Sequence, residues 1–542
     1  MSFYYYGSRG PGDEDYTESE GYKIKLLQEL LIDNPPEAIS IDTETISLKE
    51  RMPIGIGIAV SPTDAFYFPT YPELSQDIPW GILESPSITK AFFNAPFDLN
   101  VIDILHSIDR TNIADVATMA HLLNKGFIKL SMLAPEVGME TRNVKDMLGP
   151  KQTMLDLEPS EVAKKCCEDA MATLALYQSY KPRVDPDYFK IEMEVVPILI
   201  DMSNKGMRVD QELRGKLDVK FTKDVDYYKT LCDGEGFSPS SPQQVGYILA
   251  KRGNFLPFTR SRKSLKADAA TLELLDDPIA AVVLNFRKAN TLLNRYIHPL
   301  ANEDRIFTEY NLDAVTGRIS SSNRNLQNIP PGEVRNMFLP DSDVFTHADY
   351  SQEELRILAH LSGDREMLKA YEENEDIHQL TADLMRIPRK IAKNVGFAMI
   401  YGATPQTIRS TAKVRDIRLC YNLMDKWFNA FKGAAEWIKG TQNEGLRNGY
   451  IETMFGRRID LPLGFENDEA IKRKAVNYII QGTGAEIMKR ALIKCKELPL
   501  VVTVHDSMMF DGDVRLELSQ LGLDSIAPLY TPMSVKLLQK WE

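Results

Sequence analysis

The sequence predicts a multidomain α+β protein, and three observations point to this class. The chain has 542 residues, which corresponds to about three domains at roughly 100–200 residues each. Short apolar runs typical of strands occur at residues 38–45, 54–60 and 65–69 and recur after residue 300. Helical periodicity fills long stretches between them, including a block near 365–450. We therefore expect an α/β domain, followed by a sheet domain that carries a helical domain as an insertion.

Composition and charge exclude several classes of protein. Hydrophobic residues make up 43% and charged residues 26% of the chain, which is ordinary for a globular protein with a sizeable core. A net charge of −13 excludes a simple basic nucleic-acid coat protein but allows a locally basic cleft. The five cysteines form no CxxC pair, which argues against a structural zinc site. No signal peptide or membrane-spanning run is visible, so we expect a cytoplasmic monomer that does not contact a membrane.

Carboxylates gather in the first third of the chain. The apolar run 38–45 contains Asp42 and Glu44, which strand alternation places on one face. The segment 94–99 supplies Asp98, and the helical run 160–180 supplies Asp169. Four such groups would suit two Mg²⁺ or Mn²⁺ ions, one to generate hydroxide and one to stabilise the leaving oxygen. A lone DxE is far more often a capping or solvated pair, so the hypothesis depends on the order of all three segments.

A basic helix is predicted after Pro388. Residues 386–415 contain seven basic residues and no acidic one. Arg389, Lys393, Phe397 and Tyr401 recur every four residues, so their stripe drifts by only ~40° per step and stays on one side. Two cations followed by two aromatic rings suit the phosphates and the base of a nucleotide. For this helix taken alone, an amphipathic helix with snorkelling basic side chains is an equally good interpretation.

Two further aspartates lie near strand ends. Residues 347–364 are expected to begin as a strand and continue as a helix, whereas 502–510 are expected to form two strands that meet at His505 and Asp506. If the fold brings Asp349 and Asp506 together, they could hold two metals between a 3′-hydroxyl and an α-phosphate. Taken singly, each aspartate is more often a turn or capping residue.

Together these segments resemble family A DNA polymerases, the DNA polymerase I family, with a 3′–5′ proofreading exonuclease domain of the DEDD type. DYSQEELR resembles motif A, RxxxKxxxFxxxYG motif B and VHDS motif C, and residues 316–330 resemble the TGRLSS…NLQNIP segment. The similarity covers residues 36–542. It implies an RNase H-like α/β exonuclease domain and a right-hand polymerase domain with an antiparallel-sheet palm and helical fingers and thumb.

The implied domains are the exonuclease at 1–186, the thumb at 187–300, the first palm segment at 301–364, the fingers at 365–455 and the second palm segment at 456–542. The implied reaction adds deoxynucleotides from dNTPs to the 3′-hydroxyl of primer–template DNA through two Mg²⁺ ions, or Mn²⁺. A compact chain with no visible 5′-nuclease region resembles a phage replicative enzyme acting in the host cytoplasm, with a bacterial or organellar origin as the alternative. Replisome partners such as a helicase-primase or a single-strand-binding protein are not identifiable from the sequence.

The resemblance also implies roles for individual residues. The exonuclease metals would be bound by Asp42, Glu44, Asp98 and Asp169, and the polymerase metals by Asp349, Asp506 and the main-chain carbonyl of Tyr350. The incoming nucleotide would contact Arg389, Lys393, Phe397, Tyr401, Gln352, His505 and Glu354, with Lys393 as a catalytic residue and Glu354 as the steric gate against a 2′-hydroxyl. DNA would contact Arg318, Arg473, Asn477, Gln481 and the basic loop residues Arg260, Arg262 and Lys263, although a merely solvated loop is an equal alternative.

Several positions depart from the family pattern, including motif B, where the family's Asn-Phe-Gly is Gly396-Phe397-Ala398. Lys165 stands where the exonuclease family has a tyrosine that orients the attacking water, Glu353 replaces an apolar residue, and Ser507 replaces a glutamate after the motif C aspartate. A cationic amine cannot accept the proton of that water in the same way, so the rate of proofreading is left open. The alternatives are an exonuclease whose second half only binds DNA, a non-catalytic binding protein, and a single-subunit RNA polymerase, which Glu354 disfavours.

Overall fold

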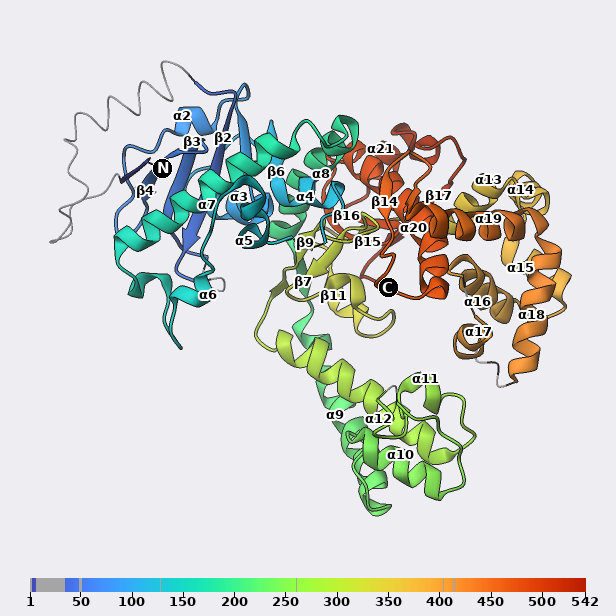
Figure 1. Ribbon diagram of the computed structural model, residues 1–542. Coiled ribbons are helices and arrows are strands. Elements are labelled where there is room, and N and C mark those ends of the chain that lie inside the picture. Colours follow the sequence, from blue (N-terminus) through green and yellow to red (C-terminus); the bar gives the residue numbers. More distant parts are fainter. Residues whose placement is uncertain are drawn as a thin grey trace. The chain divides into compact units, whose positions relative to one another are not determined.

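The computed structural model describes residues 2–5, 35–47, 51–126, 128–259, 261–402, 404–412, 414 and 416–542. The chain divides into two compact units, Met1–Asp201 and Met202–Glu542, and each contains both strands and helices, as the sequence predicts (Figure 1). Across these residues, none of the helices combines the length and the apolarity that crossing a membrane requires. The four predicted domain boundaries stay predictions.

A six-stranded mixed sheet forms the centre of the first unit. Its strand order is β1-β4-β3-β2-β5-β6. The three predicted strands are β2 (Ala38–Thr45), β3 (Pro53–Ser61) and β4 (Asp64–Pro69), and they are antiparallel neighbours. The parallel strands β5 (Thr89–Phe92) and β6 (Ile113–Asp115) extend the sheet on one side, and β1 (Ser2–Tyr5) pairs with β4 on the other. The α/β character predicted for this part is confirmed.

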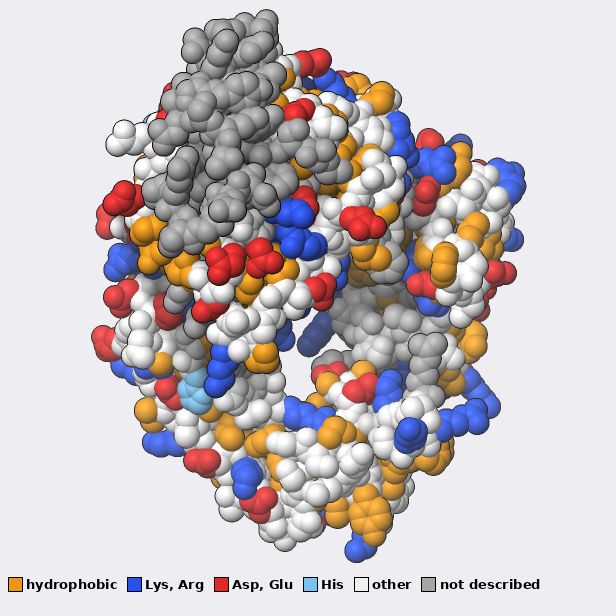
Figure 2. Space-filling model, turned by 60° about the vertical axis from the view of Figure 1, so that its left-hand side comes forward, with side chains coloured by type: hydrophobic (Ala, Val, Ile, Leu, Met, Phe, Trp, Pro, Cys, Tyr) orange, Lys and Arg blue, Asp and Glu red, His pale blue; other side chains and the backbone are white. Residues whose placement is uncertain are grey.

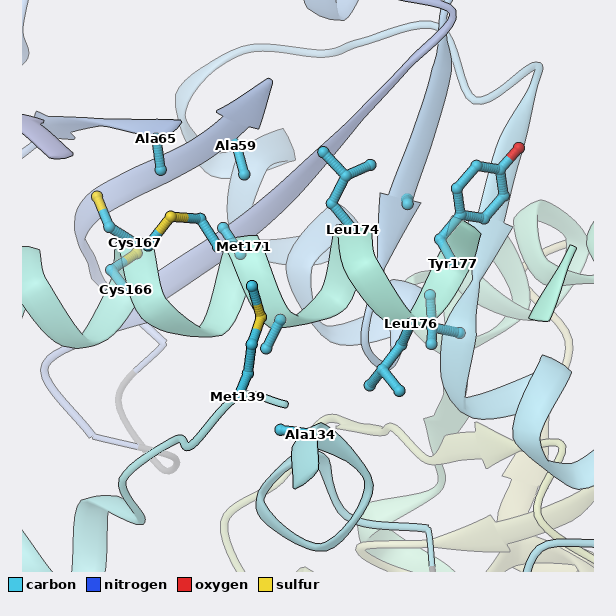
Figure 3. Packing of buried hydrophobic residues seen from close by; sticks show 14 of the residues in the cluster. Ala59, Ala65, Ala134, Met139, Cys166, Cys167, Met171, Leu174, Leu176 and Tyr177 are labelled. Atoms are coloured by element: carbon cyan, nitrogen blue, oxygen red, sulfur yellow. The ribbon is translucent and has the colours of Figure 1, made fainter. Parts of the chain in front are cut away.

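Helix α7 (Pro159–Tyr180) lies across this sheet, where the sequence predicts a helix over 160–180. Figure 3 shows its residues Cys166, Cys167 and Met171 close to Ala59 and Ala65 of the sheet. The contact depends on small residues, because a Cβ added to Gly57 of β3 would lie 2.8 Å from the sulfur of Cys166 and 3.1 Å from its carbonyl oxygen. The absence of a side chain at position 57 therefore allows α7 to pack closely on β3.

The described part of this unit also contains short α-helices. They are α2 (Trp80–Leu83), α3 (Ala95–Leu105), α4 (Val116–Leu122), α5 (Leu130–Leu133) and α6 (Val144–Met147). Helix α8 (Pro186–Lys205) follows α7, and the division between the two units falls inside it.

The second unit has a four-stranded antiparallel sheet in the order β15-β16-β12-β17. Its strands are β12 (Phe345–Tyr350), β15 (Leu500–Val504), β16 (Ser507–Asp511) and β17 (Met533–Leu538). A small sheet is formed by β7 (Met207–Val209), β8 (Arg305–Ile306) and β11 (Phe338–Leu339), and two pairs are formed by β9 (Glu309–Asn311) with β10 (Ser320–Ser322) and β13 (Tyr450–Glu452) with β14 (Arg458–Asp460). The main sheet thus joins strands from residues 345–350 and 500–538, as the predicted helical insertion requires.

The described part of the second unit also contains many α-helices. The stretch up to residue 300 contains α9 (Gln211–Gly234), α10 (Pro242–Lys251), α11 (Ala269–Leu272) and α12 (Pro278–Leu292). After β12 come α13 (Glu353–Ser362), α14 (Arg365–Glu372), α15 (Ile377–Met385), α16 (Arg389–Ile400), α17 (Pro405–Thr411), α18 (Ile417–Ala430) and α19 (Lys432–Asn448), and later α20 (Asp468–Lys494) and α21 (Arg515–Gln520). The predicted basic helix is α16, which begins after Pro388 and ends before Gly402, where φ is +63°.

Acidic and basic side chains are interspersed on the face shown in Figure 2. The negative net charge is therefore not concentrated in one patch on that face.

Candidate active sites

A cavity of about 480 Å³ in the second unit collects side chains from β12, α13, α15, α16, α20 and the β15–β16 turn. Its lining consists of Arg318, Ile319, Gln327, Asp349, Tyr350, Ser351, Gln352, Glu353, Glu354, His378, Lys393, Phe397, Tyr401, Gly484, Ala485, Met488, Thr503, His505 and Asp506. Eleven of these residues were singled out from the sequence, ten as candidate site residues and Glu353 as a departure from the family pattern. Segments as distant as residues 318 and 506 therefore meet in one site.

Strand register explains why the two aspartates meet. Asp349 of β12 pairs with Ser507 of β16, so Asp506, which precedes Ser507 in the turn, lies beside it. The main-chain N–H of Tyr350 donates a hydrogen bond to the carbonyl oxygen of Asp506 at 3.0 Å. The buried Tyr350 hydroxyl donates to the carbonyl of Leu523 at 3.0 Å, which is compatible with a main-chain role for Tyr350 at the cavity.

The two aspartates form a negative site that Lys393 and Lys536 compensate only in part. Burial, followed by repulsion from Asp506, raises the pKa of Asp349 to about 6, and burial also raises the pKa of Asp506. Among the described residues, neither carboxylate has an ion-pair partner. Two such carboxylates are hard oxygen ligands, and these donors fit a divalent cation of the Mg²⁺ type.

Helix α16 presents most of its predicted stripe to this cavity. Lys393, Phe397 and Tyr401 line it, and the Lys393 nitrogen lies 6.0 Å from the centre of the Phe397 ring. Arg389 does not line the cavity. Its Nε instead donates to Asp376 Oδ2 at 2.8 Å, and both side chains are more than a third exposed.

Glu354 is held by two of the other predicted residues. Arg318 Nη2 donates to its Oε1 at 2.5 Å, and the Tyr401 hydroxyl donates to its Oε2. Glu354 is the second residue of α13, and its side chain is only 12% exposed. Both oxygens are thus occupied, which fixes the side chain in the cavity wall.

Of the other predicted residues, two line the cavity and the rest of those described do not. Gln352 and His505 line the cavity, and both have positive φ angles, 59° and 56°. The predicted DNA contacts Arg473, Asn477 and Gln481 recur every four residues on α20, hence on one side of that helix, and none lines the cavity. Arg262 and Lys263 are exposed, and Arg260 lies outside the described residues.

The cavity also contains residues that sequence reasoning did not single out. His378 reaches it because α15 packs against α16, with its ring centre 5.6 Å from that of Phe397, and no local pattern signals this. Gln327 Nε2 donates to the carbonyls of Ile319 and Thr503, both at 3.1 Å. In the sequence, the signal that could have identified Gln327 as a site residue was its position in the segment 316–330.

Glu353 lies buried beside the cavity, with 5% of its surface exposed. Its Oε1 has no hydrogen-bond partner within the described part of the chain, and burial raises the pKa of this carboxyl well above its usual range. It fits because residue 484 is a glycine, where an added Cβ would lie 2.8 Å from Glu353 Oε2.

A second cluster of carboxylates lies in the first unit. Asp42 and Glu44 come from β2, Asp98 from α3 and Asp169 from α7. The main-chain N–H and the hydroxyl of Thr43 donate to Asp98 Oδ1 at 3.0 and 2.7 Å. The structure therefore assembles the four predicted carboxylates from three separate elements of one unit.

Lys165 lies within this cluster. Its Nζ is 2.6 Å from Glu44 Oε1 and 2.8 Å from Asp169 Oδ2. Burial lowers the pKa of Lys165, but the carboxylates of Glu44, Asp169 and Asp42 outweigh burial and raise it well above its usual range. The ammonium group is therefore charged and acts as the counter-ion of the cluster.

The cluster as arranged does not fit two divalent ions, because the ammonium group takes a cation's place between Glu44 and Asp169. Burial raises the pKa of Asp98 to about 8 and that of Asp42 well above its usual range, so burial opposes ionisation of these two carboxyl groups. Single oxygens of Asp42 and Glu44 and the sulfur of Cys166 lie within 4.8 Å of one another. Burial also raises the pKa of the Cys166 thiol, which disfavours the thiolate that metal binding requires.

Comparison with known proteins finds a different family in each of the two parts of the chain. Residues 209–518 match the family described as DNA polymerase family A, and residues 22–185 match the family described as 3′-5′ exonuclease. DNA polymerase I of Chloroflexus aurantiacus is 30% identical over 92% of this chain, and that of Pseudomonas aeruginosa is 29% identical over 91%. The chain spans about 60% of the length of both relatives.

Among solved structures, the POL domain of Pol1 from M. smegmatis, in complex with DNA primer-template and dNTP, has a TM-score of 0.81 to this chain at 24% identity. The match covers 97% of this chain and 99% of that one. This likeness shows the fold, and with the two family matches it confirms the predicted class of an exonuclease domain joined to a polymerase domain.

Proposed function

Since the chain belongs to DNA polymerase family A, we propose that it synthesises DNA on a template by adding deoxynucleotides to a primer 3′-hydroxyl. The observation that carries this proposal is the cavity in which Asp349, Asp506, Lys393 and Glu354 meet. The similar fold of a polymerase domain solved with primer-template DNA and dNTP also supports it.

Asp349, Asp506 and the main-chain carbonyl of Tyr350 would hold the two metal ions of the reaction, Mg²⁺ or Mn²⁺. When bound, these ions would neutralise charge on the α-phosphate and favour ionisation of the primer hydroxyl. The pair of buried aspartates supports this assignment, because like charges close together, with no ion pair to either of them among the described residues, favour binding of a cation.

Residues of α16 would bind the triphosphate and the base. Lys393 supplies a positive charge for phosphate oxygens, and Phe397 and Tyr401 supply flat surfaces for the sugar and base. Arg389 would have to leave Asp376 to reach the phosphates. Because both partners are more than a third exposed, that ion pair contributes at most ~1 kcal/mol and is readily exchanged for phosphate.

Glu354 would select deoxynucleotides. Its carboxylate is fixed by Arg318 and Tyr401, so it cannot easily move away from a 2′-hydroxyl. Gln352 and His505 would add contacts to the nucleotide from the same cavity. The remaining predicted DNA contacts, Arg473, Asn477, Gln481, Arg262 and Lys263, would bind primer and template.

The first unit would remove nucleotides from the primer 3′ end, as the match to 3′-5′ exonucleases suggests. Asp42, Glu44, Asp98 and Asp169 are assembled for this role, although the fit to two metals is incomplete. The curated relatives named above are bacterial, and a phage origin stays a prediction.

The test is extension of a 5′-labelled primer annealed to a template, in the presence of Mg²⁺ and with or without the four dNTPs. The variant Asp506→Ala should abolish extension while leaving shortening without dNTPs intact. The matched control is Asp513→Ala, which removes an exposed aspartate that pairs locally with Arg515 and should extend normally. Extension by Asp506→Ala at the normal rate would disprove the assignment, and preferential use of ribonucleotides would favour the RNA polymerase alternative.

A further inference from the structure

Lys165 is built into the carboxylate cluster by the fold. Lys165 and Asp169 are one turn apart on α7, and Glu44 lies opposite on β2. The side chains are only 7%, 11% and 6% exposed, respectively. Because Cys166, the next residue of α7, is packed over Gly57, the helix has little freedom to move the ammonium group away from the strand.

The two carboxylate sites of the chain therefore differ in one respect. Asp349 and Asp506 form no ion pair among the described residues, and Lys393 and Lys536 lower the pKa of Asp349 only from a longer distance, whereas Glu44 and Asp169 share a buried ammonium group. Lys165 does not neutralise the whole cluster, since Asp42 Oδ2 and Asp169 Oδ1 have no hydrogen-bond partner in the described part of the chain. The cluster still attracts a cation, but the position between Glu44 and Asp169 is occupied.

We propose that Lys165 is a built-in cation that replaces one divalent ion of the exonuclease site, so that metal binds there only after the ammonium group has been displaced. Because the ammonium group is attached to α7, it offsets negative charge of the cluster even when no metal ion is bound. The carboxylates can therefore stay close together in the metal-free protein. The inference that primer shortening requires displacement of the ammonium group rests on the exonuclease activity proposed above. The inference that the ammonium group weakens metal binding does not rest on it.

The test measures Mn²⁺ binding to the full chain carrying Asp349→Asn and Asp506→Asn, which remove the polymerase ligands. In this background, Lys165→Met should bind Mn²⁺ at least about tenfold more tightly, because a competing charge is removed from a buried site. Mn²⁺ should also raise the unfolding temperature of Lys165→Met more than that of the background. Lys165→Arg, which keeps the charge, should bind Mn²⁺ as the background does.

The matched control is Lys164→Met. Lys164 is the preceding lysine on α7, its side chain is 50% exposed, and its nearest carboxylate, that of Glu168, is 3.9 Å away, so Mn²⁺ affinity should not change. Equal affinity in the background and in Lys165→Met would overturn the proposal. A Lys165→Met protein that stays unfolded even with Mn²⁺ would also overturn it, since the metal should replace the ammonium group. Loss of primer shortening in every variant would instead count against the proposed exonuclease activity.

Discussion

Replacing Glu353 by glutamine tests whether a buried carboxyl group destabilises the polymerase cavity. Burial, followed by the negative charges of Asp506 and Glu354, raises the pKa of Glu353 well above 4.5. Its side chain has one unpartnered oxygen and is 5% exposed. The folded protein therefore keeps this carboxyl protonated at pH values where the unfolded chain ionises it.

The sign and size of the stability change expected for Glu353→Gln follow from proton linkage. A carboxyl whose pKa is raised by folding costs no stability below the unfolded pKa, near 4.5, and costs about 1.4 kcal/mol for each pH unit above it until the folded pKa is reached. Glutamine has a similar size and no titrating proton. Glu353→Gln should thus exceed the wild-type protein in stability by about 1.4 kcal/mol or more at pH 8, with the advantage shrinking toward pH 5.

The assay is thermal unfolding in EDTA at several pH values between 5 and 8, where such a difference corresponds to a shift of about 2–4 °C. Glu372→Gln, at an exposed glutamate of α14, should show no pH-dependent advantage. A Glu353→Gln protein that is less stable than wild type at pH 8, or whose pH dependence is unchanged, would refute the reasoning.

Three further predictions follow from the contacts described above. Gly57→Ala should lower the free energy of unfolding of the first unit by about 1–3 kcal/mol, because the added methyl meets Cys166 at 2.8 Å; wild-type stability in denaturant would contradict this. The Mn²⁺ affinity of the polymerase cavity should fall as the pH drops through about 6, where protons compete for Asp349; an affinity that is constant from pH 5 to 7.5, measured by titration, would contradict it. Glu354→Ala, which also releases Tyr401, should raise the kcat/KM ratio for ribonucleotides over deoxynucleotides by about 10–200-fold; an unchanged ratio would show that the gate lies elsewhere.

Local patterns in the sequence were sufficient for much of the fold. The run 38–45 is a strand with the predicted bounds, and α16 begins and ends where Pro388 and Gly402 indicate. The turn at Asp506 is also where the two β-runs predict it. These features could be predicted because side-chain periodicity and proline or glycine punctuation act on the backbone within a few residues.

Contacts between distant segments were decided only by the tertiary structure. The sequence identified Lys165 as a departure, but its position between Glu44 and Asp169 depends on how closely α7 packs on the sheet. Likewise, Arg389 belongs to the predicted stripe yet pairs with Asp376, and Glu353 fits only because Gly484 leaves room for it. The sequence by itself predicted which residues would carry the chemistry, whereas packing determined which charges meet, because the energy of a charge depends on neighbours that lie far away along the chain.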